Sequence, residues 1–188
     1  MIEELVKKTR SVRRFKEEQI EKETLLYLVN IARFSASGAN LQPLKYILSF
    51  EEKMNDVIFT FLKWAGYLRD WKGPEKGERP SAYIILLGDK SVSASFGCDH
   101  GIAAQNIMLG AVEKGLGGCM IGSVNRERLR KDLNIADFFE ILLIIALGKP
   151  NEQVVLETVG PDGDIKYWRD SQGVHHVPKR KLEEIIVG

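Results

Sequence analysis

Three arginines and a serine lie close together near the start of the chain and could bind one anion. They belong to the segment Arg10-Ser11-Val12-Arg13-Arg14. Guanidinium groups and a hydroxyl form short, charge-assisted hydrogen bonds to phosphate oxygens. The segment therefore predicts a binding site for a phosphate monoester. The alternative is a solvent-exposed basic surface that binds no ligand.

A second set of polar side chains follows a predicted helix. Residues 37–43 carry the hydroxyl of Ser37 and the carboxamides of Asn40 and Gln42. A carboxamide presents a donor and an acceptor side by side, which suits the edge of a heterocycle with carbonyl and imide groups. The alternative is a polar turn that ends at Pro43.

Residues 115–123 are rich in glycine but match neither of two common nucleotide-binding motifs. The dinucleotide fingerprint requires a third glycine where Met120 stands, and it must follow a strand rather than a helix. The P-loop requires a lysine where Ser123 stands. The glycines between 118 and 122 could instead let backbone N–H groups approach a planar ligand closely. A helix end followed by a strand explains the same residues.

The histidines and cysteines predict no metal site. His175 and His176 are adjacent, so on a strand their side chains point to opposite faces and cannot easily bind one metal ion. Cys98 and Cys119 match no zinc spacing and are too few for a disulfide framework, so we expect both to be buried, reduced thiols. A nucleophile-elbow motif, Gly-x-Ser-x-Gly, is also missing, which argues against hydrolase chemistry.

Composition predicts a single globular domain over residues 1–188. The 27 Lys and Arg residues nearly balance the 26 Asp and Glu residues, which gives a net charge of +1 and argues against a dedicated nucleic-acid binder. No apolar run approaches the ~20 residues that a membrane span needs. The N-terminal residues lack the apolar stretch of a signal peptide. We therefore expect a soluble, cytoplasmic protein.

Hydrophobic periodicity predicts helices separated by buried strands, which indicates an α+β or α/β fold with a mixed sheet. Helices are expected over residues 22–34, 51–70, 96–116 and 125–133, and strands over residues 45–50, 82–88 and 141–148. Residues 165–169 and 174–177 should form a hairpin, and residues 181–187 a short helix or an extended tail. Apolar side chains cover nearly the whole circumference of 96–116, so we expect that helix to be buried on all sides.

Five segments, taken in this order, resemble the FMN-dependent nitroreductase family over nearly the whole chain. They are the opening Arg-Ser-x-Arg-x-Phe at 10–15, the segment 32–43, the long helix and glycine turn at 99–122, Gly-Lys-Pro at 148–150 and Val-Pro-Lys-Arg at 177–180. The chain departs from the family pattern at Thr9, Ala36, Leu44 and Ser123. Those departures leave the substrate side of the site and the electron donor open.

The resemblance implies an FMN site. Phosphate and ribityl oxygens would meet Arg10, Ser11, Arg13, Lys179 and Arg180. The flavin ring edge or ribityl chain would meet Ser37, Asn40 and Gln42, and backbone N–H groups of Gly122 and Ser123 would lie near the reactive flavin nitrogen. Trp64, Tyr67 and Trp71 are candidates for an aromatic substrate lid, although core packing also explains them.

The resemblance further implies an α+β homodimer with a mixed central sheet, a long central helix and a flavin site shared between subunits. The expected activity is electron transfer from NADH or NADPH to a small nitroaromatic or quinone acceptor by a ping-pong mechanism. Because FMN carries the chemistry, no catalytic side chain is expected. Alternatives are dehalogenation, flavin destruction or azoline oxidation within the family, or a non-enzymatic FMN store or sensor.

Overall fold

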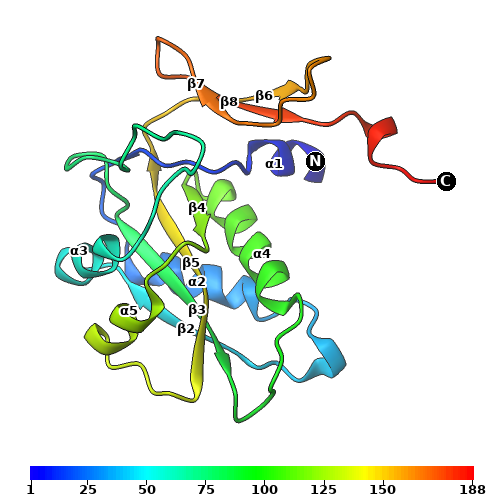
Figure 1. Cartoon of the computed structure of the whole chain (residues 1–188). Coiled ribbons are helices and arrows are strands. Elements are labelled where there is room, and N and C mark those ends of the chain that lie inside the picture. The colour runs from blue at the N-terminus through cyan, green and yellow to red at the C-terminus, as the bar shows by residue number, and fades with distance from the viewer.

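The structure is a computed structural model that describes residues 1–188 (Figure 1). The helices are α1 (Ile2–Lys8), α2 (Lys22–Ala32), α3 (Glu52–Thr60), α4 (Asp99–Glu113) and α5 (Arg126–Asp132), with short 3-10 helices η1 (Gly38–Asn40) and η2 (Leu182–Glu184). The strands are β1 (Phe15–Lys16), β2 (Leu44–Ser49), β3 (Ala82–Asp89), β4 (Gly117–Ile121), β5 (Phe139–Pro150), β6 (Val154–Thr158), β7 (Trp168–Arg169) and β8 (His175–Lys179).

The five strands β1 to β5 form the central sheet. The order along the sheet is β1-β5-β3-β2, and β4 also pairs with β5. All of these pairings are antiparallel. Ser11 adds a parallel bridge to Gly118 at the edge of β4, so the mixture of strand directions is confined to that edge.

Helices cover both faces of the central sheet (Figure 1). The alternation of side chains along β3 divides the core in two, because successive residues of a strand point to opposite faces. Ile84 and Leu86 pack with α2 and α4. Tyr83 and Ile85, on the other face, pack with apolar residues of α3, α5 and the segment after α3.

A second, smaller sheet lies over α1 and one end of α4 (Figure 1). Its order is β6-β8-β7, with β6 parallel and β7 antiparallel to β8. The predicted hairpin is confirmed, because Asp170 N donates to Val174 O at 3.1 Å and closes the turn between β7 and β8. The last residues leave this sheet and reach away from the body of the protein.

The strongly patterned elements match their predictions in type and place. This holds for α2, α5, β2, β3 and β5, although β5 extends further at both ends than expected. The segment 182–184 is a 3-10 helix, one of the two conformations expected for the tail. The α+β class is confirmed.

The predicted helix over 51–70 is too long. Helix α3 ends at Thr60, and Ala65 has a left-handed backbone with φ 37°. The segment instead runs beside the residues after β4, where Lys63 N donates to Ser123 O at 3.0 Å and Asn125 N donates to Phe61 O at 2.9 Å. The apolar side chains therefore reach the core from an irregular segment, and helical spacing alone did not reveal this.

Helix α4 is shorter than the predicted 96–116 and is not buried on all sides of one chain. It ends before Gly115, which has φ 73°. Ala103 and Ile107 are fully buried, whereas Ile102 is 36 % exposed and Leu109 is half-buried. Cys98, just before the helix, is exposed, which contradicts the expected burial, while Cys119 on β4 is buried as expected. One side of α4 is therefore left uncovered.

No helix of this structure has both the length and the apolar character needed to cross a membrane.

Candidate functional site

A cavity of about 320 Å³ lies where the N-terminal segment, α4, β4 and the small sheet meet. It combines cationic, neutral polar and apolar side chains. Its lining residues are Thr9, Arg10, Ser11, Arg13, Gln105, Met108, Met120, Tyr167, His175, Val177 and Lys179. Four predicted site residues, Arg10, Ser11, Arg13 and Lys179, are therefore brought together from the two ends of the chain.

Positive charge dominates this cavity. Arg10, Arg13 and Lys179 line it, and no carboxylate does. Burial lowers the pKa of Arg10, although the group stays charged, and its Nε is buried without a hydrogen-bond partner. Cations that are partly removed from water and lack an anionic neighbour attract an anion strongly. The electrostatics of the cavity therefore suit a phosphate or carboxylate.

The backbone of the N-terminal segment is held against β4. Val12 N donates to Gly118 O at 2.8 Å, next to the bridge between Ser11 and Gly118. A Cβ atom at Gly118 would lie 2.7 Å from the backbone oxygen of Ala146, which is too close for any other residue without movement. Glycine at this position lets the strands approach and so places Arg10 and Arg13 beside the cavity.

A buried carboxylate fixes the same segment from the other side. The side chain of Glu152 is 1 % exposed and accepts hydrogen bonds from the backbone N–H groups of Arg13 and Arg14. Its second oxygen accepts from Arg169 Nη2 at 2.7 Å. Glu152 therefore joins the N-terminal segment, the turn after β5 and strand β7.

The two adjacent histidines point to opposite faces of the small sheet, as the sequence predicts. His175 is fully buried, lines the cavity and contacts Arg13. His176 stacks on Trp168 at a centroid distance of 4.0 Å. Its ring nitrogens pair with Glu157 and, at 3.3 Å, with Asp170.

Ser37, Asn40 and Gln42 lie away from this cavity, beside the N-terminal end of α4. Ser37 and Gln42 line a separate cavity of about 170 Å³ with Asp99. The Ser37 hydroxyl donates to Asp99 Oδ2 at 2.6 Å, and Gly38 N donates to Asp99 Oδ1 at 3.1 Å. One chain therefore does not join the two predicted halves of the site.

Backbone strain marks the same loop. Ala39, Asn40 and Gln42 all have positive φ, between 48° and 54°. Such conformations cost of order 1–3 kcal/mol each and persist only where the surroundings impose them. The hydrogen bonds to Asp99 supply that restraint and leave the Asn40 and Gln42 side chains exposed.

The remaining predicted contacts lie outside the first cavity. Gly122 and Ser123 follow β4 and are exposed, and Gly122 lies roughly 13 Å along the chain from Gly118. Met120, which lies between Gly118 and Gly122, lines the cavity. Arg180 is exposed and pairs with Glu184 at 3.8 Å.

The three lid candidates occupy different places. Trp64 is buried and packs against Phe59 at 5.8 Å, so it belongs to the core rather than to a mobile lid. Tyr67 packs against Tyr167, which lines the cavity, at 4.9 Å. Trp71 lies 4.3 Å from the guanidinium of Arg169. Tyr67 therefore contacts a residue that lines the cavity, whereas Trp71 contacts Arg169, which pairs with Glu152 and does not line it.

Sequence reasoning missed several lining residues, including Gln105, Met120, Tyr167 and His175. Gln105 and Met120 lie within segments that carry the family resemblance, which is a signal that could have found them. Tyr167 precedes the predicted turn with no motif of its own. Only the fold of the small sheet brings it over the N-terminal arginines.

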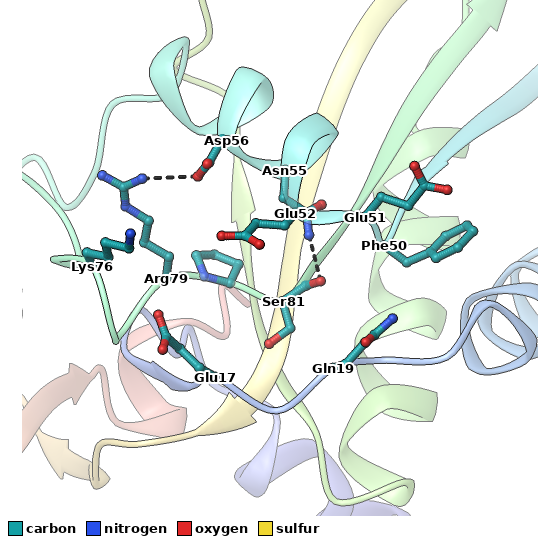
Figure 2. Close-up of a pocket in the computed structure, with 11 residues that line it drawn as sticks. Glu17, Gln19, Phe50, Glu51, Glu52, Asn55, Asp56, Lys76, Arg79 and Ser81 are labelled. Atoms are coloured by element: carbon teal, nitrogen blue, oxygen red, sulfur yellow. Dashed lines mark hydrogen bonds and ion pairs between the residues drawn. The ribbon is translucent and has the colours of Figure 1, made fainter.

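A larger cavity, of about 610 Å³, lies elsewhere and differs in character (Figure 2). It is bounded by the start of α3 and the loop before β3, and Phe50 is its one apolar lining residue. Asp56 and Arg79 pair across it at 3.2 Å. Ligand pockets are usually lined by apolar and aromatic groups, and this cavity is not. No cluster of three or more His, Cys, Asp or Glu side chains could hold a metal ion.

The fold and the edge of β4 with its glycine turn define an α+β protein of the nitroreductase type. A family model described as "Nitroreductase family" matches residues 6–149. The chain therefore belongs to the nitroreductase family.

Relatives of known name agree with this assignment. The chain is 26 % identical over 169 residues to an iodotyrosine deiodinase of Thermotoga neapolitana, covering 81 % of this chain and 90 % of the relative. An FMN-dependent nitroreductase of Clostridium difficile has a TM-score of 0.66 at 24 % identity, covering 81 % of this chain and 89 % of that one. A Desulfovibrio desulfuricans protein, assigned as a nitroreductase and solved in complex with FMN, has a TM-score of 0.73 at 19 % identity, covering 100 % and 95 %. These two structures establish the fold.

The two adjacent histidines should make the free energy of unfolding depend on pH in opposite directions. The hydrogen bond to Glu157, and then that to Asp170, raises the pKa of His176. The resulting stabilisation is full below the unfolded pKa of about 6.5 and is lost as pH rises through the folded value. Burial, and then Arg13, lowers the pKa of His175 to about 4, so stability is lost as pH falls from about 6.5 toward 4.

Urea denaturation of the wild type, His176→Gln and His175→Gln between pH 4 and 9 would measure this. The deficit of His176→Gln relative to the wild type should be largest near pH 5 and smallest at alkaline pH. The stability of His175→Gln relative to the wild type should increase as pH falls below 6. If the free energy of unfolding of both variants varies with pH as that of the wild type does, the pKa shifts given to the two histidines are wrong.

Proposed function

We propose that the protein binds FMN at the cavity beside β4 and works as an oxidoreductase. Electrons would come from NADH or NADPH and pass to a small aromatic acceptor, such as a nitroaromatic compound or a quinone. The observation that carries the proposal is the cluster of Arg10, Arg13 and Lys179 in a cavity wall without carboxylates.

The residues present suit FMN. Arg10 and Lys179 would hold the phosphate, and the Ser11 hydroxyl and the Gln105 amide would meet ribityl oxygens. Met108 and Met120 give the cavity a polarizable apolar wall for a planar ring. FMN, when bound, supplies the transfer of hydride and electrons. The chain's own groups bind it, orient it and keep water from one side.

The remaining contacts would come from a second copy of the chain. Ser37, Asn40 and Gln42 stand on a preformed loop that does not reach this cavity within one chain. Exposed apolar side chains lie on α1, the uncovered side of α4 and the C-terminal segment. The C-terminal segment projects from the body of the protein (Figure 1). The exposed apolar side chains are Ile2, Val6, Ile102, Leu182, Ile185, Ile186 and Val187. We infer a homodimer that buries them and completes the site, with Arg180 a further proposed contact.

Tyr67 and Trp71 would shape the acceptor side. Both lie on the irregular segment after α3. Tyr67 packs on Tyr167, which lines the cavity, and Trp71 packs on Arg169, two residues further along the chain. Gly122 and Ser123, at the far end of β4, would offer backbone N–H groups beside the reacting part of the flavin. A side-chain acid or base is not required by this arrangement.

A second candidate reaction is reductive dehalogenation of a halogenated aromatic compound. It is favoured by the likeness to the iodotyrosine deiodinase, which covers 81 % of this chain. The same cofactor site would serve both reactions, so the acceptor is what distinguishes them.

Removing one cavity cation should weaken FMN binding. Arg10→Ala and Lys179→Ala should each raise the Kd for FMN about 10- to 150-fold, since a hydrogen bond to a charged group is worth roughly 1.5–3 kcal/mol. Riboflavin, which lacks the phosphate, should be affected much less. Arg128→Ala, on exposed α5, is the matched control. Quenching of flavin fluorescence measures the Kd, and equal effects on FMN and riboflavin would show that these cations do not bind the phosphate.

If the protein is a homodimer, its mass in solution should be about twice 21.2 kDa. Ile102→Lys places a charge on the uncovered side of α4 and should shift light scattering to the monomer and weaken FMN binding together. Phe138→Lys changes a more exposed apolar residue between α5 and β5, 50 % exposed against 36 % for Ile102, and should leave both unchanged. A monomeric wild type that still binds FMN tightly would refute the shared site.

Turnover should follow ping-pong kinetics, because donor and acceptor must in turn reach the same face of one bound flavin. Double-reciprocal plots for NADH or NADPH against a quinone or nitroarene should give parallel lines. Replacement of the acceptor by an iodophenol tests the dehalogenation reaction. If the protein binds FMN but neither nicotinamide reduces it, the enzymatic reading fails and a flavin store or sensor remains.

A further inference from the structure

Arg13 carries a buried positive charge that is held without an anionic partner. The residue is 8 % exposed and lines the cavity. Its Nη1 lies 3.1 Å from Nε2 of His175 and 3.4 Å from Ser11 O, and its guanidinium lies 4.8 Å from the centre of the Tyr167 ring. One oxygen of Glu152 accepts a hydrogen bond from the backbone N–H of Arg13, and the other pairs with Arg169. The Arg13 side chain therefore forms no ion pair.

The contact with His175 fixes the state of that imidazole. A guanidinium has donors only, so Nε2 of His175 must accept and the ring proton must lie on Nδ1. Nδ1 is buried and has no hydrogen-bond partner. The ring is tilted against Tyr167 at 5.2 Å, so it is held in place by packing as well as by Arg13.

The charges of Arg13, Arg169 and His176 favour this neutral form, and that of Glu152 opposes it. Arg13 faces it from the N-terminal segment, Glu152 from the turn after β5, Arg169 from β7 and His176 from its own strand. Burial, and then the charge of Arg13, lowers its pKa to about 4. His175 therefore accepts a hydrogen bond from Arg13 at neutral pH.

A neutral acceptor orients the guanidinium without cancelling its charge. A carboxylate in the place of His175 would form an ion pair with Arg13 and weaken its attraction for a bound anion. The Tyr167 ring also orients the guanidinium without cancelling its charge, because the ring face attracts a cation but carries no net charge. The arrangement keeps a buried cation both fixed and available.

We propose that His175 is a positioning residue for anion binding: its Nε2 holds the Arg13 guanidinium toward the cavity, where it binds the anionic cofactor. The proposal rests on the proposed FMN site and adds a residue that neither the motif nor the resemblance assigns. It predicts that His175 acts only through Arg13.

A double-mutant cycle with FMN as the probe tests this coupling. His175→Phe keeps a ring against Tyr167 and removes the acceptor, and should raise the Kd for FMN about 10- to 100-fold. His175→Gln can place an amide oxygen near the position of Nε2 and should stay within about threefold of the wild type. Arg13→Ala combined with His175→Phe should bind FMN no more weakly than Arg13→Ala alone. His176→Phe, on the opposite face of β8, is the control and should match the wild type.

The outcomes separate the two proposals. If the wild type does not bind FMN, the proposed function fails. If the wild type binds FMN but His175→Phe matches it, or if the loss is equally large on the Arg13→Ala background, the positioning role is wrong. Should His175→Phe not fold, His175→Leu enters the same cycle, and circular dichroism verifies the fold of each variant.

Discussion

The buried carboxylate of Glu152 is the constraint on which the site depends. Removing a charge from water costs several kcal/mol unless hydrogen bonds and an opposite charge compensate. Here the backbone N–H groups of Arg13 and Arg14 and the guanidinium of Arg169 supply them. These partners come from segments about 140 and 17 residues away in sequence. The carboxylate therefore makes the small C-terminal sheet and the N-terminal segment one unit, and the cavity lies between them.

The positive character of the cavity follows from where the few carboxylates of this region are used. Glu152 binds backbone N–H groups and Arg169. Glu157 and Asp170 pair with His176 on the outer face of the small sheet. The inner face keeps Lys179 and a neutral His175 opposite the N-terminal arginines. A chain with a net charge of only +1 thereby concentrates uncompensated cations at one place. Overall charge balance could not reveal this, because the separation arises from the alternation of side chains along β8.

How much could be predicted depended on the range of the interactions involved. The buried strands β3 and β5 and helix α2 follow from local apolar patterns, and local patterns survive folding. The end of α3 at Thr60 did not follow, because backbone hydrogen bonds to Ser123 and from Asn125 draw the next residues away from the helix. The chemistry of Arg10 and Arg13 made them candidate anion ligands, and the structure places both in one cavity wall. His175 and Tyr167 could not be found from the sequence as lining residues, because they reach the cavity only once the small sheet lies over the N-terminal segment.

Helix α4 explains why half of the predicted site is missing from one chain. Its 15 residues span ~22 Å. Gln105 and Met108 border the first cavity, whereas Asp99, at its first turn, holds the strained loop that presents Asn40 and Gln42. Within one chain these two places line separate cavities. In the homodimer proposed above, two copies would pack along the uncovered side of α4, and the loop of one copy would complete the cavity of the other. On this argument the incomplete burial of α4 and the divided site have one cause.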